Sequence, residues 1–106
     1  MNKIRVQITV TEKHLDESLR LLKANPQTTR ICHCPVALAA KERLGDKFHS
    51  VGGSYIRLIN PNDKLTYTTT LPVEIWNFTR AFDTGRIDEA RAMLPLRARV
   101  RLNYPE

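Results

Sequence analysis

The two ends of the chain share the pattern that most constrains its fold, an alternation of apolar and polar residues. In residues 3–10 every second residue is Ile or Val, and in residues 96–104 every second residue is Leu, Ala, Val or Tyr. Successive side chains of a strand point to opposite faces, so each segment predicts a strand with one buried and one polar face. Chain ends often lie close together, but the sequence leaves open whether these two strands pair.

Four segments between these strands have helical signals. Thr11 offers an N-cap oxygen, and leucines then recur at i, i+4 and i+7. Pro35 suits the first position of a helix with Cys34 as its cap, and Gly45 favours its end. The predicted helices cover residues 12–24, the segment from Pro35 to Gly45, the segment from Leu71-Pro72 to Gly85 and, as a short extra helix, residues 87–94.

Three short strands are predicted in the middle of the chain, over residues 48–51, 55–58 and 64–70. Glycines at 52 and 53 mark a hairpin-type connection, and residues 60–63 form a strong turn signal. Such short turns require antiparallel neighbours. The order β-α-α-β-β-β-α-(α)-β predicts a single α+β domain over residues 1–106, with a mostly antiparallel sheet of four to five strands packed on one face by three helices.

The charge of the chain is concentrated at its ends. With 106 residues there is room for one core, and a net charge of +6 argues against an acidic mimic of nucleic acid. Residues 1–10 and 95–105 carry five basic residues and no acidic one, whereas residues 11–94 carry twelve basic and ten acidic residues. This distribution favours an anionic partner that contacts the terminal strands.

No segment has the length and apolar character of a membrane span or of a signal peptide. Cys32 and Cys34 are too close together for a useful disulfide, and two unpaired thiols favour a reducing compartment. We therefore expect an intracellular protein of the cytoplasm that has no membrane partner and needs no cofactor.

Four short motifs, spread over most of the chain, resemble those of small uncharacterised phage and prophage proteins. They occur in the same order as in that family, and they are Ile8-Thr9-Val10-Thr11, Cys34-Pro35-Val36-Ala37-Leu38-Ala39, Leu71-Pro72 and Phe82-Asp83-Thr84-Gly85. The family tends to separate its two loop cysteines by two residues, whereas one residue separates them here. The resemblance implies a phage or prophage accessory protein that acts on host machinery, and it assigns no catalytic or binding residue.

The last predicted strand carries the most informative candidate site. Arg97, Arg99 and Arg101 would project to one face at intervals of about 6.6–6.8 Å, close to the phosphate repeat of an extended nucleic-acid strand. Arginine binds phosphate through two parallel hydrogen bonds. Lys3 and Arg5 form a shorter stripe of the same kind, so we expect all five to bind nucleic acid or another anion if the terminal strands are neighbours. A solvated outer face, an edge charged against aggregation, and a site for an acidic protein surface are the alternatives.

A second candidate anion site precedes the second helix. Backbone N–H groups at a helix N-terminus attract anions, and side chains of the preceding loop could complete a site for a small nucleotide. A thiol there would have a lowered pKa, whereas a capped helix with a buried, inert Cys34 is the favoured alternative. The residues of this candidate site are Thr28, Thr29, Arg30, His33 and Cys34.

Metal binding and catalysis are weaker interpretations. Cys32 and Cys34, together with His14 and His49, could supply four zinc ligands, but Cys-x-Cys is a poor chelating spacing. A cysteine nucleophile would need a histidine nearby in space, which the sequence does not show. No complete catalytic set is visible, so we do not expect an enzyme.

Aromatic residues complete the candidates. Trp76, Phe78 and Phe82 have helical spacing and are expected in the core. Three tyrosines on predicted strands could stack on bases beside the arginines or simply cover a sheet edge.

The leading hypothesis is a non-enzymatic phage accessory protein that binds nucleic acid or a host nucleoprotein, such as a defence complex. The alternatives are a nucleic-acid-independent inhibitor or adaptor, which could be a homodimer, and a small nucleotide-binding protein.

Overall fold

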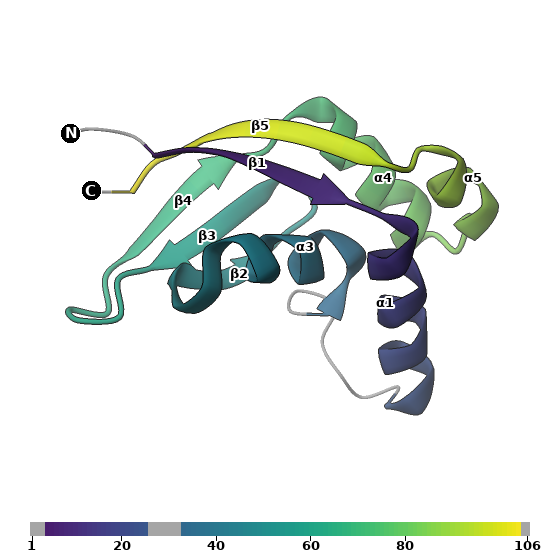
Figure 1. Ribbon diagram of the computed structural model, residues 1–106, viewed down its shortest axis with the longest axis horizontal. Coiled ribbons are helices and arrows are strands. Elements are labelled where there is room, and N and C mark those ends of the chain that lie inside the picture. Colours follow the sequence, from purple (N-terminus) through teal and green to yellow (C-terminus); the bar gives the residue numbers. More distant parts are fainter. Residues whose placement is uncertain (1–3, 26–32, 105–106) are drawn as a thin grey trace.

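Five antiparallel strands and four α-helices make up residues 4–25 and 33–104, which are the residues that the computed structural model describes (Figure 1). This confirms the predicted α+β class. In chain order the elements are β1 (Ile4–Val10), α1 (Glu12–Ala24), α3 (Pro35–Leu44), the 3-10 turn η1 (Gly45–Lys47), β2 (Phe48–Val51), β3 (Tyr55–Ile59), β4 (Thr66–Thr70), α4 (Val73–Asp83), α5 (Ile87–Ala92) and β5 (Leu96–Leu102).

The first and last strands are direct neighbours. β1 and β5 pair antiparallel along their whole length, from Ile4 opposite Leu102 to Val10 opposite Leu96. The start of β1 and the end of β5 therefore lie side by side at one end of the molecule (Figure 1). This pairing was left open by the sequence, and we refer to the two strands as the terminal ribbon.

The strands divide between two sheets rather than forming the single expected sheet. The terminal ribbon is one sheet, and β2, β3 and β4 form the other in that order. The sheets meet where β5 ends, since the Asn103 backbone N–H donates to the Thr69 hydroxyl at 2.7 Å instead of to a β4 carbonyl. Beside this bond the rings of Tyr67 and Tyr104 pack edge to face, with their centroids 5.3 Å apart. Side chains thus replace a backbone ladder between β4 and β5.

Local sequence signals explain most element boundaries. The Thr11 backbone N–H donates to His14 Nδ1 at 3.0 Å, which holds the first turn of α1. Gly45 ends α3 at a positive φ of 62°, a conformation that glycine adopts without strain. The strand predicted over 64–70 begins only at Thr66, because Lys64 lies at a positive φ of 65° and still belongs to the preceding turn.

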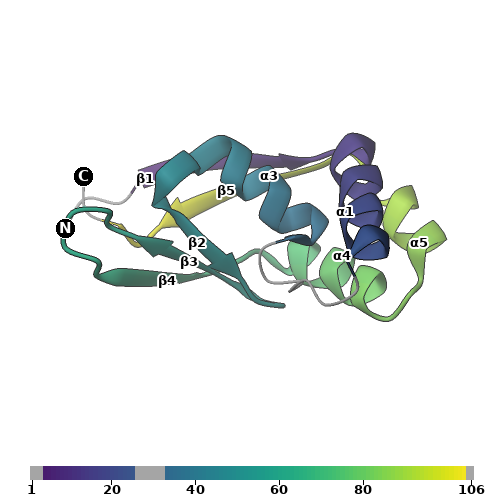
Figure 2. The ribbon, with the colours of Figure 1, turned by 90° about the horizontal axis from the view of Figure 1, so that it is seen from below.

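The helices enclose the core between the two sheets. α3 packs against β1, β2 and α1, while α4 packs against β5 and α5 (Figure 2). The buried residues come from both sheets and from these helices. The largest fully buried apolar side chains are Phe78, Phe82, Ile8, Leu15, Ile56, Leu58, Ile75 and Leu102. Among the residues in the described ranges, no helix is both long and apolar enough to cross a bilayer.

Candidate functional site

The terminal ribbon has one apolar face in the core and one polar face in solvent. The alternation of both strands produces this division, because each strand turns every second side chain inward. The buried residues are Val6, Ile8, Val10, Ala98, Val100 and Leu102. The residues of the polar face are Arg5, Gln7, Thr9, Arg97, Arg99 and Arg101.

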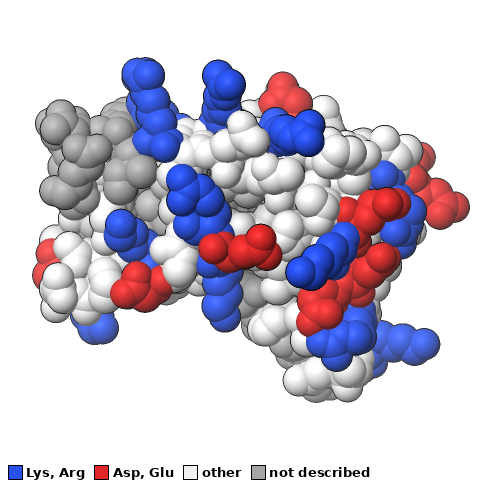
Figure 3. All heavy atoms as spheres, viewed as in Figure 1, with Lys and Arg blue, Asp and Glu red and all other residues white. Residues whose placement is uncertain are grey.

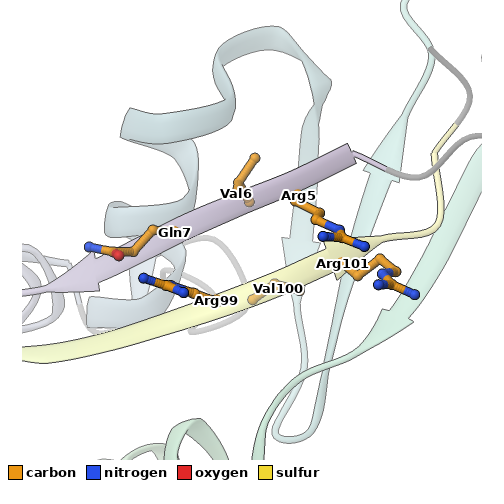
Figure 4. A pocket seen from close by; sticks show the side chains of 6 residues that line it. All are labelled: Arg5, Val6, Gln7, Arg99, Val100 and Arg101. Carbon is orange, nitrogen blue, oxygen red and sulfur yellow. The ribbon is translucent and has the colours of Figure 1, made fainter.

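The register of the ribbon places like charges opposite each other. Arg5 faces Arg101 directly, whereas Arg99 faces Gln7 and Arg97 faces Thr9. Two like charges at such positions destabilise a sheet. The side chains of Arg5, Gln7, Arg99 and Arg101 line a shallow, open hollow of about 470 Å³ on this face (Figure 4). We call this face, with its four arginines, the basic ribbon face.

The arginines of the basic ribbon face differ from three arginines of the helical region. On the helices, Arg20 pairs with Glu17, and Arg86 pairs with Glu89 at 3.0 Å. Arg91 of α5 bridges to α1, with its guanidinium 2.8 Å from Asp16. In contrast, none of the four ribbon arginines makes an ion pair with an acidic side chain of residues 4–25 or 33–104.

The space-filling view shows the same contrast over the surface. Most charged side chains at the upper edge of the molecule, along which β1 and β5 run, are basic, although an acidic side chain also projects there, whereas basic and acidic groups are mixed over α1 and α5 (Figure 3). The structure therefore brings together Arg5, Arg97, Arg99 and Arg101 as the sequence suggested. Lys3, the fifth predicted member, lies outside the described residues.

Most of the candidate anion site before α3 also lies outside the described residues, namely Thr28, Thr29 and Arg30. His33 and Cys34 are described. The His33 carbonyl accepts a hydrogen bond from the buried Ser18 hydroxyl at 2.6 Å, which ties the start of α3 to α1. His33 thus has a structural contact through its backbone.

Cys34 is the N-cap of α3 and is buried. The Cys34 sulfur accepts a hydrogen bond from the Ala37 backbone N–H at 3.4 Å, and Cys34 is only 4% exposed. Burial raises the pKa of the thiol to about 11, since an apolar surrounding disfavours the thiolate. The hypothesis of a reactive thiol with a lowered pKa is therefore wrong, because desolvation outweighs the effect of the helix N-terminus.

The candidate zinc ligands are not gathered around one point in the described part of the chain. His14 lies on α1 with Nε2 3.2 Å from Glu42 Oε2, while His49 lies on β2 with Nδ1 2.9 Å from the Ser50 hydroxyl. Cys34 is buried at the start of α3, and Cys32 lies outside the described residues. Within residues 4–25 and 33–104, no three His, Cys, Asp or Glu side chains are grouped so that they could hold a metal ion.

Two of the three aromatic residues of α4 lie in the core as predicted, and the third does not. Phe78 and Phe82 are in the core, but Trp76 is 39% exposed, so its assignment to the core is wrong. Helical spacing could not reveal this, because Trp76 lies on the edge of the apolar face of α4. Tyr67 and Tyr104 pack against each other where the two sheets meet, and Tyr104 is buried.

Searches of protein-family models, of curated proteins and of solved structures found no match to this chain.

Proposed function

We propose that the protein is a non-enzymatic binding protein that engages nucleic acid through the basic ribbon face. The observation that carries this proposal is the direct opposition of Arg5 and Arg101, beside two further arginines that lack acidic partners among the described residues. Such an arrangement costs stability in the unbound chain. A polyanion bound along the face would attract both arginines and so offset the repulsion between them.

The shape of the basic ribbon face suits a phosphate backbone. Alternate residues of a strand are about 6.6–6.8 Å apart, and Arg97, Arg99 and Arg101 occupy three consecutive positions of this kind. Each guanidinium can donate two parallel hydrogen bonds to one phosphate. The face is open and shallow, so it favours an extended ligand over an enclosed small molecule.

The resemblance to phage and prophage proteins extends this proposal to a cellular setting. In that setting the nucleic acid would be a component of a host nucleoprotein in the cytoplasm, such as a defence complex. The protein would then inhibit the complex by occupying its nucleic acid.

Fluorescence anisotropy with labelled single-stranded DNA, single-stranded RNA and duplex DNA tests the proposal. The variant Arg99→Gln/Arg101→Gln should bind its preferred nucleic acid at least roughly tenfold more weakly at low salt, because two charge-assisted phosphate contacts are lost. Its circular dichroism spectrum should be unchanged, since both side chains are exposed.

The matched control is Arg20→Gln/Lys23→Gln, which removes the same charge from the exposed surface of α1. It should bind nearly as well as the unmodified chain. Equal losses in the two variants would show that only net charge matters, and this would overturn the assignment to the ribbon. The proposal itself would be overturned if none of the three nucleic acids bound. It would also be overturned if the chain captured a host protein after nuclease treatment and Arg99→Gln/Arg101→Gln captured it equally well.

A further inference from the structure

Trp76 stands at the edge of a second hollow, remote in sequence from the basic ribbon face. It is the only tryptophan of the chain, and it is 39% exposed on α4. Val73, Asn77 and Arg80 follow the same side of the helix at spacings of three and four residues, and all three are exposed. An indole ring of this size usually contributes to a core or to an interface, so its exposure points to a ligand.

The hollow lies between α4 and the turn that precedes β3. Its volume is about 450 Å³, which is within the range of small-molecule sites. The turn contributes Gly53 and Ser54, and the helix contributes Trp76, Asn77, Arg80 and Asp83. The lining thus combines an aromatic face, an amide, a hydroxyl and charges of both signs.

One residue that lines the hollow carries a buried hydroxyl. Thr79 lines the hollow and is 5% exposed, and its Oγ1 has no hydrogen-bond partner among the described residues. Buried polar groups are rarely left unsatisfied in folded proteins.

We infer that this hollow binds a nucleotide, with the base stacked on Trp76 and the phosphate paired with Arg80. The inference goes beyond the proposed role of the ribbon and does not depend on it. Stacking on an aromatic ring accepts any base, and a guanidinium is the preferred partner of phosphate. Asn77 and Ser54 can exchange hydrogen bonds with base or ribose edges. A free mononucleotide and a nucleotide within a strand both carry this base and phosphate, so either could occupy the hollow.

The single tryptophan makes the site directly observable. Titration of the full chain with AMP and GMP should quench its intrinsic fluorescence in a saturable manner, whereas ribose 5-phosphate and glucose should leave it unchanged. Arg80→Gln should weaken AMP binding by roughly tenfold, because one charged phosphate contact is lost. Arg20→Gln, which removes an arginine from α1, is the matched control and should bind AMP normally.

A variant that adds a side chain to the turn that lines the hollow provides an independent readout. A Cβ at Gly53 would meet no atom within 4 Å, so Gly53→Leu should fold normally and retain the tryptophan signal. It should bind AMP at least tenfold more weakly. A deoxyadenosine trinucleotide distinguishes the source of the ligand: tighter binding than AMP indicates a strand, and equal or weaker binding indicates a free nucleotide.

Three outcomes would overturn the inference. They are the absence of saturable quenching by AMP and GMP at millimolar concentration, quenching by sugars alone, and unchanged AMP affinity in both Arg80→Gln and Gly53→Leu. The ribbon variant Arg99→Gln/Arg101→Gln should keep its AMP affinity. Failure of nucleic-acid binding at the ribbon and failure of nucleotide binding at Trp76 are therefore separate results.

Discussion

Reversal of one charge in the Arg5–Arg101 pair should stabilise the fold and weaken its binding. Both residues are exposed and lie directly opposite each other on the terminal ribbon. Arg5→Glu or Arg101→Glu replaces a repulsion with an attraction, whereas the double variant restores a repulsion between two carboxylates. The four proteins form a double-mutant cycle that separates the pair from other effects of each substitution.

The expected size of the effect follows from the energies of cross-strand pairs. An exposed charge pair at directly opposed positions is worth roughly 0.3 kcal/mol in either direction. Each single reversal should therefore raise the free energy of unfolding by about 0.6 kcal/mol, or about 2–5 °C in Tm for a domain of this size. The coupling energy across the cycle should be about 1 kcal/mol.

Urea unfolding of the four proteins at low salt and at about 0.5 M salt measures this coupling, which screening should largely remove at the higher salt. Nucleic-acid binding should fall in both single variants although their stability rises. Single reversals that destabilise the fold with no coupling at low salt would contradict a repulsion between Arg5 and Arg101. A coupling energy that does not respond to salt would contradict it as well.

Three further predictions concern the core. The Cys34 thiol has a pKa raised by burial to about 11 from an ordinary 9.0, so the native state holds its proton more tightly. The stabilisation from the protonated thiol is complete below pH 9 and declines towards pH 11. Between these pH values, urea unfolding should show that the free energy of unfolding falls by roughly 2–3 kcal/mol more in the unmodified chain than in Cys34→Ala. Parallel pH profiles of the two proteins would contradict this. Thr79→Val should raise the free energy of unfolding by about 1 kcal/mol, because it replaces a buried hydroxyl that has no hydrogen-bond partner among the described residues, and a lower Tm would show that the hydroxyl has a partner. Phe78→Ala should lower the free energy of unfolding by about 3–5 kcal/mol, since Phe78 is fully buried; a loss below 1 kcal/mol would contradict its place in the core.

The elements of this fold were predictable because their signals are local. Alternation defined both terminal strands, and Pro35 and Gly45 marked the ends of α3. The same alternation predicted that Arg97, Arg99 and Arg101 would share one face. The pairing of β1 with β5 was not predictable, because it joins segments about ninety residues apart in sequence and depends on packing across the whole chain.

The environments of single side chains were less predictable than the elements. Cys34 has the position of a helix N-cap in both sequence and structure, but the burial that raises its pKa comes from the surrounding tertiary packing. Trp76 has the spacing of a core residue, and only the placement of the β2–β3 turn beside α4 leaves it at the edge of a hollow. The division into two sheets depends on Thr69 and Tyr67, whose contacts with the end of β5 have no sequence signature.

The salt dependence of nucleic-acid binding shows whether the arginines of the basic ribbon face contact phosphates. If the four ribbon arginines contact phosphates of a single strand, the logarithm of the association constant should fall against the logarithm of salt concentration with a slope of about −2.8. Arg99→Gln/Arg101→Gln should reduce the magnitude of this slope by about 1.4, and Arg20→Gln/Lys23→Gln should leave it unchanged. Identical slopes in the ribbon variant and the unmodified chain would show that phosphates do not bind at the basic ribbon face.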